Sequence, residues 1–225
     1  MAAFWKQTVD NSQYLAEQRA RMVNVQLRER GIRDDRVLAA MGKVPREAFV
    51  APEFARRAYA DGPLPIGAGQ TVSQPYMVGA MVEALELRSS DRVLEVGTGT
   101  GYEAAVVGEI AADVWTIERH TELAEKATQI LEELGHANVH VVCRDGSQGL
   151  PDHAPFDKIV VAAGAPAAPP SLIAQLAEDG ILAVPVGNRV EQQLLIVRKS
   201  EGVITTSRHV LCCFVPLVGV EGWQI

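Results

Sequence analysis

The chain contains few cysteines, and their spacing matches no common cysteine site. Only three of its 225 residues are cysteines, Cys143 and the adjacent pair Cys212 and Cys213, and no Cys-x-x-Cys spacing occurs. An odd number without metal-ligand spacing excludes a fully paired disulfide framework and a structural zinc site. The five histidines are scattered too, so no metal is expected. We expect three reduced thiols, buried in the protein.

Long apolar runs and a basic stripe are also missing. No apolar run approaches ~18 residues, the length of a membrane span, and residues 1–7 lack the apolar segment of a signal peptide. The 21 Lys and Arg residues are outnumbered by 28 Asp and Glu residues, whereas a general nucleic-acid surface requires excess positive charge. We therefore expect a cytoplasmic protein without membrane or nucleic-acid partners, and a monomer.

What the sequence does contain is ample apolar material, with 48% hydrophobic residues, which suits one compact domain. From residue 92 onward, apolar strand segments alternate with helical patterns, the clearest at 121–134. This alternation is typical of an α/β, Rossmann-like fold, whose mostly parallel twisted sheet has helices on both faces. The last two strands have only a turn at 200–202 between them and should form an antiparallel edge. Strands are expected at 92–96, 113–117, 139–143, 158–163, 180–186, 192–198 and 208–217.

The N-terminal third has a different pattern. A helix is expected over 12–30, ended by Gly31, and a second one from Asp34 or Asp35 to Gly42. Prolines then punctuate an irregular stretch that leads to a helix over 76–87. We predict two segments of one compact domain, a helical and substrate-side segment at 1–75 and a cofactor-binding α/β segment at 76–225.

The most informative segment is a strand that ends in a glycine turn. Within residues 92–102, glycine occupies every second position after the apolar strand, so that the backbone can approach a nucleotide-like ligand. A dinucleotide fold would place its third glycine where Tyr102 stands. The observed Glu-x-Gly-x-Gly-x-Gly instead resembles enzymes that bind S-adenosylmethionine, although a tight turn without a ligand is the alternative. The residues expected to bind this cofactor are Glu95, Gly97, Thr98, Gly99 and Gly101.

Further candidates follow the next strands, since ligands of open α/β sheets lie at the carboxyl ends of strands. Glu118 could accept hydrogen bonds from both ribose hydroxyls, or be an ordinary surface acid. Asp145 could bond the adenine amino group and Gly146 leave room for the ring, although Asp-Gly is also a common turn. The small residues at 162–166 would line a channel toward the sulfonium. They lack the Asn-Pro-Pro-Tyr type sequence of many enzymes that methylate base amino groups.

Three motifs carry a resemblance to a known family. The chain has Gly-Gln-Thr-Val-Ser-Gln-Pro-Tyr at 69–76, Val-Leu-Glu-Val-Gly-Thr-Gly-Thr-Gly-Tyr at 93–102 and Phe-Val-Pro-Leu at 214–217. Their order and spacing resemble those of the protein-L-isoaspartate O-methyltransferase family, over nearly everything from about residue 19 to 218. The resemblance implies the S-adenosylmethionine-dependent methyltransferase fold.

The resemblance also implies an activity. It is the transfer of a methyl group from S-adenosylmethionine to the free carboxylate of L-isoaspartyl, and potentially D-aspartyl, residues in damaged proteins and peptides, which starts repair through a succinimide. Ser73 would be the active-site hydroxyl, and Thr71, Val72 and the backbone near Val215 would help to hold the peptide. Without the family, Ser73 would be interpreted as a turn or N-cap serine before Pro75.

Two other functions are compatible with parts of the sequence. An enzyme of the same fold could methylate a small molecule or a nucleic acid, but the segments around Ser73 and Val215 favour a peptide. A non-catalytic module that binds S-adenosylmethionine would keep the glycine turn and could lose Ser73. Because both are present, the carboxyl methyltransferase is the preferred hypothesis.

Overall fold

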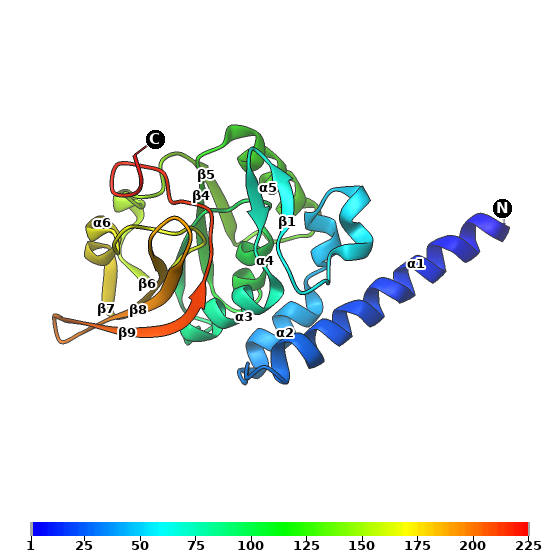
Figure 1. Ribbon diagram of the computed structural model, residues 1–225, viewed down its shortest axis with the longest axis horizontal. Helices are drawn as coiled ribbons and strands as arrows, with labels where there is room; N and C mark the ends of the chain where they lie inside the picture. The colour runs from blue at the N-terminus through cyan, green and yellow to red at the C-terminus, as the bar shows by residue number, and fades with distance from the viewer. Residues whose placement is uncertain (1, 225) are drawn as a thin grey trace.

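A seven-stranded sheet forms the centre of the computed structural model, which describes residues 2–224 (Figure 1). The strand order is β5-β4-β3-β6-β7-β8-β9, in which β3 to β7 pair in parallel and β8 and β9 are antiparallel. This confirms the predicted mostly parallel sheet with an antiparallel C-terminal edge. The bounds are β3 Arg92–Val96, β4 Asp113–Glu118, β5 Val139–Cys143, β6 Phe156–Val161, β7 Leu176–Gly187, β8 Gln192–Ser200 and β9 Val203–Cys212.

Helices cover both faces of the sheet. Successive strand residues point to opposite faces, and because neighbouring residues are both apolar, each face needs helices to bury it. Val93 belongs to an apolar cluster that includes residues of α2, α3 and α4, whereas Leu94 belongs to a second cluster that includes Leu172 of α6. The helices after β3 are α4 Tyr102–Gly108, α5 Thr121–Glu133 and α6 Pro170–Ala174. None of the helices between residues 2 and 224 is both long and apolar enough to span a bilayer.

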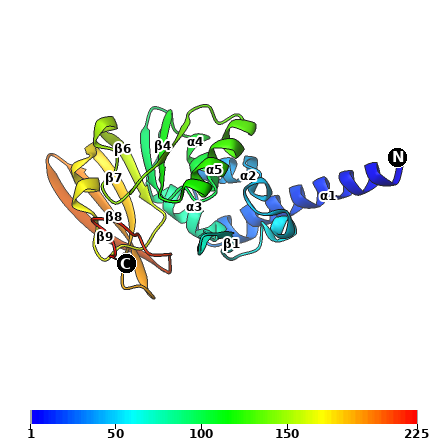
Figure 2. The same cartoon turned by 90° about the horizontal axis from the view of Figure 1, so that it is seen from above.

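The N-terminal part is more regular than the sequence predicts. Helix α1 covers Ala2–Arg21, continues as a π-helical turn at Met22–Arg28 and projects away from the sheet (Figure 2). Its start at Ala2 differs from the predicted residue 12. Helix α2, Asp35–Lys43, begins as expected, since the Asp34 carboxylate accepts a hydrogen bond from the Arg36 N–H.

The stretch expected to be irregular contains a hairpin. Strands β1, Leu64–Gly67, and β2, Gln70–Val72, pair with each other and precede helix α3, Pro75–Ala84. Both strands are too short for an alternating pattern to stand out in the sequence. Residues from both sides of position 75, such as Met41 and Val78, share one apolar cluster. The division at residue 75 stays a prediction.

The last strand lies earlier than predicted. β9 ends at Cys212, so the prediction is wrong for residues 213–217, which turn across the carboxyl ends of the parallel strands. There the Gly164 N–H donates to the Val215 carbonyl at 2.8 Å, and the Leu217 N–H donates to the Gly164 carbonyl at 2.8 Å. The side-chain oxygen of Gln192 in β8 accepts the Phe214 N–H at 2.7 Å, which ties the start of this segment to the sheet.

The cysteines are free, but the prediction that they are buried is wrong. Cys143 and Cys213 are exposed and Cys212 is half-buried. Cys143 ends β5 and Cys212 ends β9, the two edge strands of the sheet, where neighbouring elements cover fewer side chains.

Candidate active site

The glycine turn adopts a backbone conformation that other residues rarely tolerate. Gly99 has a φ of 54°, and a Cβ atom there would lie 3.3 Å from Cδ1 of Ile66 in the hairpin. Gly101 has a φ of 88°, and its Cβ would lie 3.1 Å from Leu131 of α5. Gly99 therefore lets the hairpin lie close over the turn, whereas Gly101 lets α4 begin close against α5.

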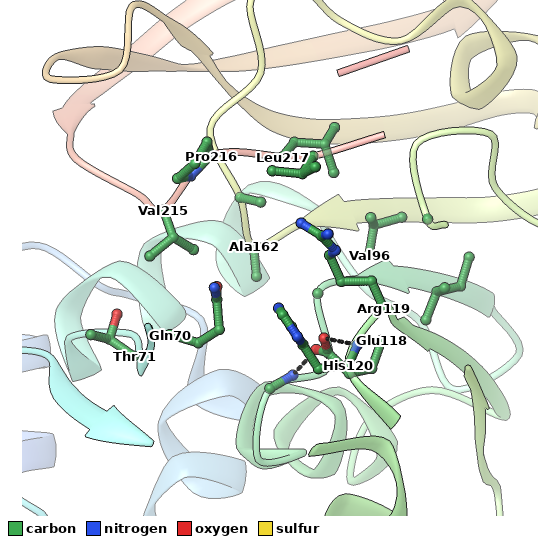
Figure 3. Close-up of a pocket in the computed structure, with 16 residues that line it drawn as sticks. Gln70, Thr71, Val96, Glu118, Arg119, His120, Ala162, Val215, Pro216 and Leu217 are labelled. Atoms are coloured by element: carbon green, nitrogen blue, oxygen red, sulfur yellow. Dashed lines mark hydrogen bonds between the residues drawn. The ribbon is translucent and has the colours of Figure 1, made fainter. Parts of the chain in front are cut away.

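A cavity lies above the carboxyl ends of β3, β4 and β6. Gln70 and Thr71 of the hairpin and the segment 215–218 form its walls, on either side of the strand ends (Figure 3). Six of the residues predicted for the site line it: Thr71, Gly97, Gly99, Glu118, Gly146 and Val215.

Glu118 is fixed by the backbone around it. One carboxylate oxygen accepts the Gly99 N–H and the other accepts the His120 N–H, both at 2.9 Å, as the dashed lines in Figure 3 show. The residue is 5% exposed and lines the cavity. Each oxygen keeps a lone pair, so the carboxylate can still accept hydrogen bonds from a ligand.

Asp145 and Gly146 are adjacent but face different surroundings. Gly146 lines the cavity, and a Cβ there would lie 2.6 Å from Val96. The Asp145 carboxylate accepts the N–H groups of Ser147 at 2.8 Å and Val220 at 2.9 Å and is not among the cavity-lining residues. Burial acts to raise the pKa of Asp145, but these backbone hydrogen bonds outweigh it and hold the pKa below its ordinary value. Asp145 thus anchors the segment after β9.

Ser73 lines a second, smaller cavity next to the first. Val72 and Thr98 also line it, and Thr71, Gly97, Gly99 and Ala162 border both cavities. The glycine turn and the predicted active-site hydroxyl are therefore neighbours.

Arg46 donates a hydrogen bond to the backbone of Ser73 and was not identified from the sequence. Its side chain is completely buried and donates to the carbonyl oxygens of Ser73 at 2.6 Å and Ala58 at 2.7 Å. Its guanidinium carbon lies 4.6 Å from the centre of the Tyr102 ring. Burial lowers the pKa of Arg46. A lone arginine in a proline-rich stretch gives no sequence signal for such a position.

Two buried glutamates lie beneath the turn. Glu95 accepts a hydrogen bond from the Thr116 hydroxyl and lines neither cavity, whereas Glu103 of α4 lines the smaller one. Burial raises the pKa of Glu103 to about 8. Burial, assisted by the nearby charge of Glu103, raises the pKa of Glu95 well above its ordinary value. Glu103 was not identified from the sequence either.

The sheet, the glycine turn and the Glu118 carboxylate at the end of β4 together define a Rossmann-like, S-adenosylmethionine-dependent methyltransferase. A family model described as protein-L-isoaspartate(D-aspartate) O-methyltransferase matches residues 17–222. The chain belongs to this family, as the resemblance implied.

Relatives and solved structures agree with this assignment. A protein-L-isoaspartate O-methyltransferase from Koribacter versatilis (strain Ellin345) is 54% identical over 206 residues, which cover 92% of this chain and 93% of the relative. A solved protein-L-isoaspartate O-methyltransferase superposes with a TM-score of 0.80 at 29% identity, covering 91% of this chain and 67% of the other. A structure from Plasmodium falciparum in complex with S-adenosyl-L-homocysteine gives a TM-score of 0.76 at 26% identity, covering 89% and 98%.

Proposed function

We propose that the chain binds S-adenosylmethionine in the larger cavity and transfers its methyl group to the free carboxylate of L-isoaspartyl residues in damaged proteins and peptides. Membership of the family supports the reaction. The observation that carries the assignment of the site is that Ser73 and the glycine turn border the same small cavity. The Ser73 hydroxyl, which would donate to the acceptor carboxylate, and the glycine turn, which would bind the cofactor, therefore border the same cavity.

The residues of the larger cavity fit the cofactor. Glu118 offers acceptor oxygens for the ribose hydroxyls, and Gly99 and Gly146 leave room where any side chain would clash or strain the backbone. When bound, S-adenosylmethionine supplies an electrophilic methyl group on a positively charged sulfur. Asp145, which does not line the cavity, would serve the adenine mainly by fixing the neighbouring wall through its bonds to backbone N–H groups.

Ser73 would orient the acceptor. A side-chain carboxylate with an ordinary pKa of ~3.9 is ionised at neutral pH, so its oxygen needs no general base. The Ser73 hydroxyl can donate one hydrogen bond to the acceptor carboxylate. Arg46 fixes the backbone of Ser73 by donating to its carbonyl oxygen. The hairpin and residues 215–218 form the walls around the cofactor cavity. Orientation of this kind can contribute ~7 to 11 kcal/mol to lowering a barrier.

The test is Ser73→Ala, assayed by methanol release on a matched pair of peptides, one isoaspartyl and one aspartyl. Loss of a hydrogen bond to a charged group, ~1.5 to 3 kcal/mol, should lower turnover about tenfold to a hundredfold. Affinity for S-adenosylmethionine should barely change. Ser89→Ala, at an exposed serine outside both cavities, is the matched control. Parental turnover by Ser73→Ala would return this serine to a turn-forming role, and equal methylation of both peptides would refute the substrate.

A further inference from the structure

The smaller cavity contains polar atoms that the protein itself leaves unpaired. Thr100 Oγ1 and Glu103 Oε1 are buried and have no hydrogen-bond partner among the described residues, and both side chains line this cavity. Buried polar atoms are nearly always paired, so two in one cavity indicate polar contents. Glu103 carries the most information, because it is only 6% exposed and is ionisable.

We propose that Glu103 binds the α-ammonium group of the cofactor's methionyl end and is ionised when it does so. This inference rests on the proposed use of the adjoining cavity for S-adenosylmethionine. Gly97, Gly99 and Ala162 border both cavities, so a ligand whose nucleoside part fills the larger one can extend its amino-acid part into the smaller one.

The charges around Glu103 favour a cationic ligand group. Glu95 of β3 is the neighbouring acid, and none of the ion pairs among the described residues involves Glu103. The guanidinium of Arg46, which lies over the ring of Tyr102, donates to two carbonyl oxygens rather than to Glu103. A ligand ammonium would supply the positive charge that these buried carboxyls lack.

Binding of the ligand ammonium should change the number of protons that the protein holds. Burial raises the pKa of Glu103 to about 8, so the carboxyl is mostly protonated at pH 7 in the free protein. An ammonium beside it favours the charged form and lowers that pKa, so binding should release a proton. Affinity should therefore rise with pH between 6 and 8.

The experiment is titration calorimetry at pH 7 in buffers of different ionisation enthalpy. S-adenosylhomocysteine should release roughly 0.5 to 0.9 proton, and methylthioadenosine, which lacks the amino-acid end, should release none. Decarboxylated S-adenosylmethionine keeps the ammonium and should also release the proton. Glu103→Gln, which imitates the protonated acid, should abolish the release and weaken S-adenosylhomocysteine about tenfold or more, while methylthioadenosine binds as before. Glu125→Gln, an exposed glutamate of α5, is the matched control.

Other outcomes overturn the proposal. If decarboxylated S-adenosylmethionine binds without releasing a proton, its ammonium group does not lie beside Glu103. A release that persists in Glu103→Gln assigns the titration to another acid. Methyl transfer to the isoaspartyl peptide by the unmodified protein, measured in parallel, reports on the proposed function separately, because the calorimetry contains no acceptor.

Discussion

Replacement of Glu118 by alanine should affect both the cofactor and the turn that holds it. The carboxylate accepts the Gly99 and His120 N–H groups, each at 2.9 Å, so Glu118→Ala removes two internal hydrogen bonds together with the expected ribose contact. Hydrogen bonds to charged groups contribute ~1.5 to 3 kcal/mol each, but water in the cavity can replace part of the internal pair. We expect the free energy of unfolding to fall by ~1 to 3 kcal/mol, and the cofactor dissociation constant to rise at least tenfold.

Two measurements separate these effects. Thermal unfolding without ligand should show Tm lowered by roughly 2 to 12 °C, given about 2 to 4 °C per kcal/mol for a domain of this size. Calorimetry with S-adenosylhomocysteine, at a temperature where the variant is fully folded, should give the weaker binding. Glu122→Ala, an exposed acid in the first turn of α5, should change neither. Unchanged affinity would remove Glu118 from the cofactor site, and unchanged Tm would show that its bonds to the turn add nothing to stability.

Three further substitutions test other parts of the site. Gly99→Val should nearly abolish S-adenosylhomocysteine binding in calorimetry, because the φ of 54° disfavours a branched residue and its Cβ would press on Ile66 at 3.3 Å. Gly219→Ala should loosen the segment after β9, since a Cβ there would lie 2.1 Å from the Asp145 carboxylate; faster proteolysis of that segment is the readout. Glu103→Gln should flatten the dependence of stability on pH. The raised pKa, about 8, means that the folded state holds a proton which the unfolded state releases above ~4.5. Stability contributed by Glu103 is thus lost as pH rises from ~4.5 to 8, by roughly 2 to 4 kcal/mol, and urea unfolding at pH 5 and 8 should show a correspondingly smaller loss in the variant, in which Glu95 still titrates.

The sheet could be predicted because its signals are local and strong. Strands at 92–96 and 139–143 have the predicted bounds, since apolar runs between polar turns leave little freedom. Asp34 could be identified as a helix cap for the same reason. The carboxyl ends of parallel strands meet at one edge, so Glu118 and Gly146 could be placed beside the glycine turn from their order alone.

The remainder depends on contacts between distant segments. Nothing near Arg46 in the sequence shows that it reaches the Ser73 carbonyl, 27 positions along the chain. Glu103 has the polarity of an exposed helix residue, yet α4 starts so close to α5 that its first turn is buried. The cofactor role of Gly101 and the adenine role of Asp145 stay predictions, because one packs against Leu131 and the other bonds backbone N–H groups.

The two walls of the larger cavity come from opposite parts of the chain. Gln70 and Thr71 precede every strand of the main sheet, and residues 215–218 follow all of them. Such long-range contacts form late in folding, since closing a long loop has an entropic cost that only near-native packing offsets. A nascent chain that has already made the glycine turn therefore has no closed cavity until its last strand has emerged from the ribosome. Affinity for the cofactor is then a property of the finished molecule, and an enzyme of this architecture cannot begin methylating while it is still being synthesised.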